Sequence, residues 1–590
     1  MSTRWTYRSL DQSVARMLEQ EAGLSSLTAR LLALRGVSSA SQAAEFLSPS
    51  LDKLHSPYLM LGMREAIDRL CAAISRHETM LIYGDYDVDG TTAVVVLKTA
   101  IELCGGTTDF HVPHRIKEGY GIKDDVIERA AAAGVKLVIS VDTGIRAFQA
   151  AETARRVGVD LIVTDHHLPE AHEGVPPALA VLNPNQGGCN YPCKDLCGAG
   201  VAFKIAQALF AKFKDASDQA RLVPSFLKMV AMATIADAVP LVDENRIIAK
   251  LGLEGLRKPV NGGLKALMEV SGLAELGRAL SAGDVGFRLG PRINAAGRMD
   301  VARDVIELFT CKDPARCRDI ALKLDHLNTE RQNEEARIVT EIEAQLAADP
   351  DLSGRFCLVF DGEGWHRGVV GIVASRVVER TGRPTLVVAR DGEEAHGSGR
   401  SISALHLLDA LESCRELFTR FGGHAHAVGF ALPSKQVEQL KCRLNSFVQS
   451  KLRAADLQPE LLIDAEIPLG EVTPSLLHEL ARLEPFGQGN PEPVFLARDL
   501  NLLLPPRVVK DKHIKLRVNQ KIPGLKNSFN YEAMGWRMAE RLGTEALQPG
   551  DRLDIAFKVA MNFHPEFGGI ELMLEDFKKS APVAIGVYSE

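Results

Sequence analysis

Three aspartates, Asp85, Asp87 and Asp89, stand at alternate positions directly after the apolar run 80–82. In an extended segment alternate side chains share one face, so the three carboxylates would crowd their negative charges together. Divalent cations bound between them would neutralise that charge. The spacing therefore predicts that this stretch forms one wall of a metal site.

A helix is expected to follow these aspartates, over residues 92–103. Gly90 allows a tight turn, and Thr91 or Thr92 is suited to cap the helix, whose N-terminus favours anions. A phosphate group could therefore bind beside the metal. The alternatives are an ordinary acidic turn and a calcium loop, although an EF-hand would need a glutamate later in the loop, where residues 94–96 are all valine.

Two further polar clusters follow apolar runs that we predict to be strands. Asp142 follows the run 137–141, and Asp165-His166-His167 follows the run 161–164. The carboxyl ends of parallel strands meet at one edge of a sheet, which is where ligands of such sheets bind. We therefore expect both clusters to converge on the first group of aspartates, although either one alone could be a polar loop.

A lone carboxylate, Asp237, lies in an apolar run that we predict to be helical. Buried carboxylates are rare unless they are paired or bind a metal. Carboxylates with imidazole and without thiolate favour Mn²⁺ or Mg²⁺ over softer metals. A carboxylate-rich pair of metal sites is suited to in-line displacement at phosphorus.

The elements that must position these residues alternate between strand and helix from residue 78 to residue 183. Strands are predicted over 80–83, 109–112, 137–141, 161–164 and 179–182, and helices over 92–103, 123–133 and 146–157. This pattern indicates an α/β fold with a parallel, doubly wound sheet. A second α/β lobe repeats the alternation with strands at 356–360 and 385–389, and short strands after residue 500 indicate a small β barrel of OB type.

We accordingly predict five parts of the chain. They are a helical lead-in over 1–55, a catalytic α/β domain over 56–320, a connecting helix over 321–350, a second α/β lobe over 351–455 and a β barrel over 456–590.

Composition limits the classes of partner and compartment. The 590 residues carry a formal net charge of −7, so the chain as a whole lacks the basic character of a nucleic-acid-binding protein, and any such contact must be local. No signal-peptide core and no long apolar run is present, so we expect a cytoplasmic protein that does not enter a membrane. The ten cysteines fit a reducing compartment, and Cys189, Cys193 and Cys197 are either free thiols or, with a fourth ligand that is not evident, a zinc site.

Several basic and polar residues are suited to binding DNA. Arg292, Asn294 and Arg298 lie in a glycine-rich run that we expect to be a turn, and Arg115 follows the second strand. An arginine grips phosphate with a forked geometry, so these residues are predicted DNA contacts, with surface salt bridges as the alternative.

Glycine-rich runs in the second lobe and basic residues in the barrel extend this prediction. The second lobe offers Ser398, Arg400, His424 and His426 beside glycines whose backbone could hold phosphates. The barrel offers Lys512, Lys515 and Arg517 near the aromatic residues Phe529, Tyr531 and Trp536. Charge and base stacking together suit a single strand, whereas the alternative is that the aromatic residues are barrel core and the lysines are merely solvated.

Together these motifs resemble a known family. Asp85-Tyr-Asp-Val-Asp-Gly, Asp142-Thr-Gly, Asp165-His-His and Asp237 are similar to the four motifs of the DHH phosphoesterases, and the run 422–429 resembles the motif of their partner domain, DHHA1. The runs Arg35-Gly-Val, Ala44-Glu-Phe-Leu, 289–298 and 365–376 resemble the branch of this family that degrades single-stranded DNA from 5′ to 3′.

The resemblance implies two divalent cations, Mn²⁺ or Mg²⁺, and a division of roles. Asp142 would bridge the ions, Asp87 would hold one with support from Asp85, and the other would be held by Asp89, His166 and Asp237. His167 would face the scissile phosphate as a donor. Ser398 and Arg400, with Arg115, would bind the 5′ end and set the polarity. Tyr83 departs from the pyrophosphatases of the family, which have a histidine at that position, so the role of Tyr83 and of Asp85 at the first ion is left open.

The expected function is therefore a metal-dependent exonuclease that releases mononucleotides from the 5′ end of single-stranded DNA in repair and recombination. The implied partners are single-stranded DNA, a single-strand-binding protein and a helicase, with the enzyme itself a monomer. Two alternatives are another DHH activity on pyrophosphate or short oligonucleotides, and a non-catalytic DNA-binding scaffold.

Overall fold

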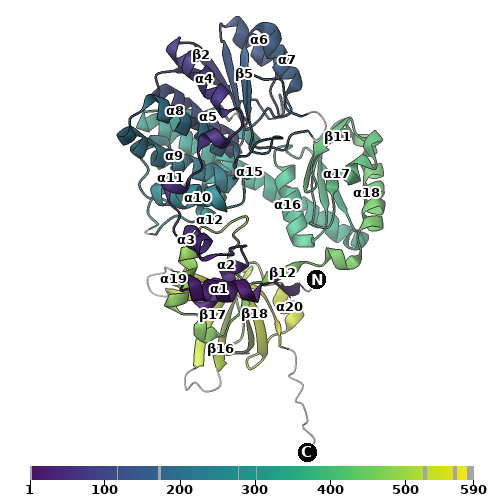
Figure 1. Ribbon diagram of the computed structural model, residues 1–590. Helices are drawn as coiled ribbons and strands as arrows, with labels where there is room; N and C mark the ends of the chain where they lie inside the picture. Colours follow the sequence, from purple (N-terminus) through teal and green to yellow (C-terminus); the bar gives the residue numbers. More distant parts are fainter. Residues whose placement is uncertain are drawn as a thin grey trace, which may run out of the picture. The chain divides into compact units, whose positions relative to one another are not determined.

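Two units make up the chain, each with its own core. Figure 1 shows the computed structural model, which describes residues 3–115, 117–170, 174–276, 278–300, 302–521, 528–562 and 568–580. One unit is Ser50–Gln458, and the other combines Met1–Pro49 with Pro459–Glu590. The predicted domain boundaries remain predictions, but the pairing of the first 49 residues with the last 132 was not foreseen from the sequence.

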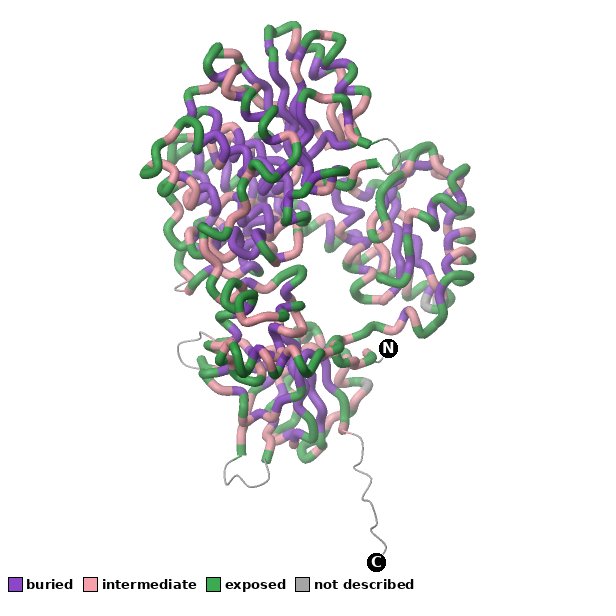
Figure 2. The backbone as a smooth tube through the Cα atoms, viewed as in Figure 1, coloured by how far each residue is buried: buried purple, intermediate pink, exposed green. Residues whose placement is uncertain are grey.

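The first sheet of the larger unit has five parallel strands in the order β3-β2-β4-β5-β6, which confirms the expected α/β fold. Its strands are β2 (Thr79–Tyr83), β3 (Thr107–His111), β4 (Leu137–Val141), β5 (Asp160–Thr164) and β6 (Ala180–Leu182). Figure 2 shows that the strands of this region are largely buried. A sheet covered on both faces needs apolar strands, which is why all five residues of β4 are buried.

Helices cover both faces of this sheet. α6 (Asp124–Ala132) and α7 (Phe148–Val157) pack on one face together with Leu81, Val138 and Leu161. α4 (Met63–Ser75), α5 (Val88–Leu103) and α8 (Gly198–Phe213) pack on the other face with Ile82, Ile139 and Ile162. Successive strand residues point to opposite faces, so this division follows from the alternation of neighbouring residues in each strand.

A helical region follows the sheet and joins it to the second lobe. Its elements are α9 (Ala216–Ala236), α10 (Asp243–Leu256), α11 (Gly262–Val270), α12 (Ala282–Asp284), a π-helical turn η3 (Val285–Leu289), α13 (Gly290–Met299), α14 (Arg303–Thr310) and α15 (Pro314–Ala348). The predicted connecting helix is α15, which begins at Pro314, and Asp313 caps its N-terminus. The run expected to be a turn at 289–298 is instead α13.

The second lobe contains a mixed sheet in the order β10-β11-β9-β8-β7. Its strands are β7 (Leu358–Glu363), β8 (Thr385–Asp391), β9 (Glu394–Arg400), β10 (Arg420–Gly423) and β11 (Ala427–Pro433). Only the pair β7–β8 is parallel, and the crossover between these strands is α16 (Val370–Thr381). The helices α17 (Leu407–Glu412) and α18 (Val437–Lys451) complete the lobe.

The smaller unit is a barrel of OB type, as predicted. Its strands are β12 (Glu460–Ile463), β13 (Ala465–Glu466), β14 (Phe495–Leu502), β15 (Arg507–Val509), β16 (His513–Lys521), β17 (Ser528–Gly535), β18 (Arg552–Asn562) and β19 (Gly569–Lys579). The order β14-β18-β19-β17-β16 is closed by an additional pairing between β14 and β16.

Two C-terminal helices, α19 (Pro474–Leu483) and α20 (Arg541–Glu545), accompany the barrel. The N-terminal segment joins it through β1 (Arg4–Tyr7), which pairs in parallel with β12, and through α1 (Gln12–Glu21), α2 (Ser26–Ala33) and α3 (Ala40–Leu47). Leu18, Leu31 and Leu32 of these helices are buried in the barrel core.

The described part of the chain contains no helix that is both long enough and apolar enough to span a membrane.

Candidate metal centre

The first aspartate cluster lies across a boundary between loop and helix. α5 begins at Val88, because Asp87 is its N-cap and the Oδ1 atom of Asp87 accepts the N–H of Gly90 at 3.0 Å. The prediction of a tight turn at Gly90 is therefore wrong, because Gly90 lies in the first turn of this helix. A Cβ atom on Gly90 would lie 2.6 Å from the Cβ of Asp85, so this glycine lets the first helical turn pack directly on Asp85.

The two threonines lie inside this helix and do not cap it. The hydroxyl of Thr91 donates to the carbonyl of Asp87 at 2.6 Å, and both Thr91 and Thr92 are fully buried. Asp89 belongs to the first helical turn, so the alternation expected of an extended segment is also wrong. The three carboxylates nevertheless converge, because the loop and the helix start wrap around the same point.

The predicted metal ligands, together with Asp85 and His167, form three groups, in each of which the ligand atoms lie within 4.8 Å of one another. The groups are Asp85-Asp87-Asp142, Asp89-His166-Asp237 and Asp142-His166-His167. Asp142 is shared between the group on the Asp87 side and a group that contains His166. The Nε2 atom of His166 lies 3.2 Å from Asp142, 3.7 Å from Asp89 and 3.8 Å from Asp237.

The electrostatics of these carboxylates fit bound cations. Burial, followed by the charge of Asp87, raises the pKa of Asp85 to about 8, and burial, followed by the charge of Asp89, raises the pKa of Asp237 to about 9. Burial and the surrounding aspartates also raise the pKa of Asp142 well above its usual range. Within the described residues, Oδ1 of Asp85 and Oδ1 of Asp142 are buried without a hydrogen bond. Buried carboxylate oxygens without donors suit divalent cations.

Asp89 is held by a helix start that the sequence prediction missed. The N–H groups of Gly198 and Ala199, at the N-terminus of α8, donate to the two oxygens of Asp89 at 2.5 and 2.8 Å. A Cβ atom on Gly198 would lie 2.5 Å from the Cβ of Asp142. The signal in the sequence was the run Cys197-Gly-Ala-Gly, which opens a helix with small residues.

Asp165, which belonged to the predicted Asp-His-His cluster but was given no role of its own, orients the second histidine. Its Oδ1 atom lies 2.7 Å from Nδ1 of His167 and accepts the N–H groups of His166 and His167, and its Oδ2 atom accepts the N–H of Ile145. Burial opposes the charge of His167, but the contacts with Asp165 prevail and raise the pKa of His167 to about 9. Burial lowers the pKa of His166, which suits a neutral metal ligand.

Two tyrosines near the centre have different roles. The hydroxyl of Tyr120 lies 3.3 Å from Nδ1 of His167 and 3.4 Å from the carbonyl of Asp142, and the side chain is half exposed. Tyr120 was missed, although its place between two glycines after Arg115 was a signal. Tyr83 is fully buried and donates to the carbonyl of Gly121 at 3.1 Å, so it packs in the sheet and is not in any of the three groups.

Three of the predicted DNA-binding arginines lie together. Arg115 stacks over the ring of Tyr86 at 5.0 Å, and burial and the charges of Arg115 and Arg331 lower the pKa of Arg298 to about 9. Burial and Arg115 also lower the pKa of Arg400. The effect of the Arg115 charge on both Arg298 and Arg400 indicates a positive cluster, which favours an anion.

Two other residues that were predicted to contact DNA form hydrogen bonds within the protein. Arg292 donates to Asp325 at 2.8 Å, which is the salt bridge weighed as an alternative. The side-chain oxygen of Asn294 accepts the N–H of Val88 at 3.0 Å.

Ser398 and Arg400, predicted to lie beside glycines whose backbone could hold phosphates, are part of the strand β9. β9 places Gly397 and Gly399 against Phe430 and Val428, where a Cβ atom would lie 2.1 and 2.8 Å from those side chains. The glycines therefore serve packing. Ser398 and Arg400 lie on the opposite face, toward the start of α16.

The histidines of the second lobe lie beside this face. His424 and His426 have ring centroids 6.3 Å apart, and the N–H of His426 donates to Nδ1 of His424. Burial, together with the charges of His426 and Arg400, lowers the pKa of His424.

Only some of the barrel residues that were predicted to contact DNA are exposed. Lys515 forms an ion pair with Glu532 at 2.5 Å, and Phe529 and Tyr531 pack against the barrel core. Lys512 and Arg517 are exposed, and Trp536 is 54% exposed over His513. Phe529 and Tyr531 are therefore part of the barrel packing, which was the alternative to base stacking, whereas Trp536 is not.

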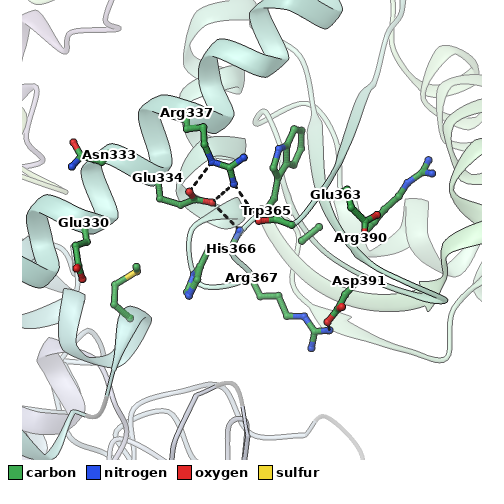
Figure 3. Close-up of a pocket in the computed structure, with 13 residues that line it drawn as sticks. Glu330, Asn333, Glu334, Arg337, Glu363, Trp365, His366, Arg367, Arg390 and Asp391 are labelled. Carbon is green, nitrogen blue, oxygen red and sulfur yellow. Dashed lines mark hydrogen bonds and ion pairs between the residues drawn. The ribbon is translucent and has the colours of Figure 1, made fainter.

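The cysteines and a pocket beside α15 belong to no metal-binding group of the described residues. Cys189, Cys193 and Cys197 are buried free thiols, and none belongs to a metal-binding group of the described residues. A pocket of about 870 Å³ lies between α15 and the second lobe. Figure 3 shows that Arg337 in this pocket is turned onto Glu334. Arg367 donates to Asp391 at 3.0 Å.

The sequence matches three family descriptions that cover these regions. They are the N-terminal domain of the DHH family over residues 79–234, the DHHA1 domain over 354–450 and the RecJ OB domain over 463–576. The ligand groups lie within the first matched range except for Asp237, which follows its end, and Ser398 and Arg400 lie within the second.

Known proteins resemble the chain over nearly its whole length. The single-stranded-DNA-specific exonuclease RecJ of Bacillus subtilis is 36% identical over 576 residues, which is 97% of this chain and 70% of that protein. The crystal structure of RecJ from Thermus thermophilus in complex with Mn²⁺ matches with a TM-score of 0.81 and 28% identity, covering 98% of this chain and 80% of that one. The structure of the same protein with Mg²⁺ matches with a TM-score of 0.76 and 27% identity, covering 98% and 79%.

Proposed function

The chain belongs to the RecJ family of single-stranded-DNA-specific exonucleases, and we propose that its acidic centre holds two divalent cations and hydrolyses single-stranded DNA from the 5′ end. The protein is a metal-dependent exonuclease that uses Mn²⁺ or Mg²⁺. The roles of individual residues below are proposals drawn from the contacts and charges of the site.

The observation that carries the proposal is the place of Asp142. This buried carboxylate belongs to the groups Asp85-Asp87-Asp142 and Asp142-His166-His167, and its Oδ1 atom lies 3.2 Å from Nε2 of His166, which also belongs to the third group. A single carboxylate in that position can serve two cations, with Asp85 and Asp87 on one side. Asp89, His166 and Asp237 lie on the other side.

Cations bound here would supply positive charge that activates water and neutralises charge on the phosphate during in-line displacement. The aspartates hold that charge in place. His167, kept protonated by Asp165, presents Nε2–H to a phosphate oxygen and stabilises the negative charge that develops there. The hydroxyl of Tyr120 lies 3.3 Å from the same Nδ1 atom that Asp165 contacts, and this leaves Nε2 free for the phosphate.

The positive cluster of Arg115, Arg298 and Arg400 is the proposed anion pocket for the 5′ end. Burial, followed by the charge of Arg115, lowers the pKa of Arg298 and of Arg400, so a phosphate placed among these groups relieves their repulsion. Ser398 lies on the same strand face as Arg400 and can donate its hydroxyl. Binding one terminal phosphate would set the direction of cleavage.

The exposed residues Lys512, Arg517 and Trp536 of the barrel are proposed to hold the strand farther along, by charge and stacking. We also propose that the protein acts as a cytoplasmic monomer in repair and recombination, on strands that a helicase opens and a single-strand-binding protein covers. These statements rest on family membership.

Incubation with end-labelled substrates tests the activity. The protein with Mn²⁺ or Mg²⁺ is given single strands labelled at either end, duplex DNA and pyrophosphate. Loss of single strands from the 5′ end with mononucleotide products is expected. Hydrolysis of pyrophosphate alone, or binding without cleavage, would contradict the proposal and favour another phosphoesterase or a scaffold.

The Asp142→Ala variant gives the matched control for this experiment. It lacks the shared ligand, so it is expected to be inactive at every metal concentration while it still binds single strands. Appreciable residual turnover would contradict the bridging role.

A further inference from the structure

The peptide group that joins Asp87 to Val88 is held by a residue from a helix that is distant in the sequence. Val88 is the first residue of α5, and its N–H has no partner within the helix, as at any helix start. The side-chain oxygen of Asn294, from α13, accepts this N–H at 3.0 Å. The identity of the accepting atom is fixed by the donor, because a backbone N–H requires an oxygen opposite it.

A second contact of α13 supports the same loop. Gly297 lies so close to the loop that a Cβ atom there would be 2.3 Å from the carbonyl oxygen of Tyr86. α13 thus contacts the backbone on both sides of Asp87, at Tyr86 and at Val88. Val88 is itself 2% exposed, so its peptide group is packed on all sides.

We propose that Asn294 is a positioning residue, which fixes the orientation of the Asp87–Val88 peptide and thereby the directions of the Asp87 and Asp89 carboxylates. The inference rests on the proposed function, because these aspartates are metal ligands only under it. It replaces the expectation that Asn294 contacts DNA.

Geometry explains why one hydrogen bond has this effect. Asp87 groups with Asp85 and Asp142, whereas Asp89 groups with His166 and Asp237, so the two carboxylates serve different ions. Rotation of the peptide between them would redirect both carboxylates at once. Residues that orient metal ligands through such bonds typically change metal affinity or activity by roughly 10- to 100-fold when they are replaced.

Two substitutions of Asn294 separate positioning from DNA contact. Asn294→Leu keeps a similar size and removes the acceptor, whereas Asn294→Asp keeps an oxygen that can accept the N–H of Val88. Mn²⁺ affinity is measured without DNA, from the paramagnetic resonance signal of the free ion. We expect Asn294→Leu to bind Mn²⁺ roughly 10- to 100-fold more weakly and Asn294→Asp to stay near the wild-type affinity.

Kinetics on a single strand give the second readout. Under the positioning role, Asn294→Leu lowers kcat at a fixed Mn²⁺ concentration and leaves KM for the strand unchanged, and Asn294→Asp restores kcat. If the amide of Asn294 instead donates to a DNA phosphate, Asn294→Asp should be more damaging than Asn294→Leu, because the new carboxylate would repel phosphate. A raised KM that is worse for Asn294→Asp, with Mn²⁺ affinity unchanged, would overturn the proposal.

A matched control is Asn333→Leu, an exposed asparagine on α15, which should change neither Mn²⁺ affinity nor kcat. If Asn294→Leu fails to fold, Asn294→Ala takes its place with the same expected loss of Mn²⁺ affinity. The test is separable from the proposed function, since Mn²⁺ binding needs no substrate. Wild-type exonuclease activity together with unaltered Mn²⁺ binding by both acceptor-free variants would overturn the positioning role alone.

Discussion

The Nδ1 atom of His167 lies 2.7 Å from Oδ1 of Asp165, a buried carboxylate that also accepts three backbone N–H groups. These donors and the charge of His167 lower the pKa of Asp165 despite its burial. Asp165 therefore stays ionised and fixes both the orientation and the charge of His167. Asp165 thus affects the site through His167, whose pKa and orientation it sets.

Replacement of Asp165 by Asn should shift the pH dependence of the exonuclease. The pKa of His167 is about 9 beside Asp165, so the donor is protonated below that pH and loses its proton as the pH rises through it. Without the carboxylate, the pKa should fall toward about 6.5 and the alkaline limb of the kcat profile should move to lower pH. At neutral pH kcat should fall roughly 10- to 100-fold.

The pH profile of kcat at saturating strand and Mn²⁺ provides the measurement for this substitution. Asp109→Asn, at an exposed position of β3, serves as the control. An alkaline limb at the same pH in wild type and Asp165→Asn would show that His167 is not the donor.

Stabilisation by metal should increase with pH. The carboxyl pKa values of Asp85 and Asp237 are raised to about 8 and about 9, whereas in the unfolded chain such groups titrate near about 4. Between these values the folded protein binds more protons, so the free energy of unfolding without metal falls as the pH rises. Cations need the deprotonated carboxylates, so their stabilising effect grows over the same interval.

Thermal unfolding with excess Mg²⁺ and with chelator, from about pH 6 to about pH 9, tests this dependence. At a free-ion concentration 100 times Kd, the gain is about 2.7 kcal/mol. The difference in Tm should widen toward alkaline pH in the wild type and should be much smaller in Asp142→Ala. A difference in Tm that is constant across this range would show that the carboxylates are already ionised without metal.

Replacement of Arg400 by Ala should weaken recognition of the 5′ end. Loss of a charged hydrogen bond to phosphate costs about 1.5–3 kcal/mol, which is roughly a 10- to 100-fold rise in KM for 5′-phosphorylated strands. Strands with a 5′ hydroxyl should be affected less, and Mn²⁺ affinity should not change. Competition between the two kinds of strand gives the measurement, with Arg390→Ala as the control because Arg390 pairs with Asp361. An unchanged preference would place the 5′ pocket elsewhere.

Much of the fold and of the metal centre was predictable because it depends on local patterns. Apolar strands alternate with helices, and polar residues at the ends of parallel strands must share one edge, so Asp142 and His166 could be placed near Asp87 from the sequence. The start of α5 was misplaced by four residues, because a side chain that caps a helix was taken for part of a strand-like run.

Contacts between distant segments were not predictable from one sequence. Val88 and Asn294 are 206 residues apart, and no periodicity or turn signal connects them. The pairing of β1 with β12 was equally unpredictable, because Arg4 and its partner Glu460 are separated in the sequence by all the residues of the larger unit. The glycines of β9 were predicted to hold phosphates through their backbone, because the side chains that pack against them, Phe430 and Val428, come from another strand.

Gly198→Ala should damage the metal centre although residue 198 is not a ligand. Its Cβ atom would lie 2.5 Å from the Cβ of Asp142 and 2.7 Å from its Oδ1, so Asp142 or the start of α8 must move. Movement of α8 would also withdraw the N–H groups that hold Asp89. We expect Mn²⁺ affinity to fall by roughly 10- to 100-fold, as for loss of a residue that orients a ligand. Gly200→Ala is the matched control on the same helix, because its Cβ would meet only the side chain of Leu196, at 3.2 Å, which can move aside. Equal Mn²⁺ affinity in the two variants, measured by titration without DNA, would show that the close approach of α8 to Asp142 does not shape the site.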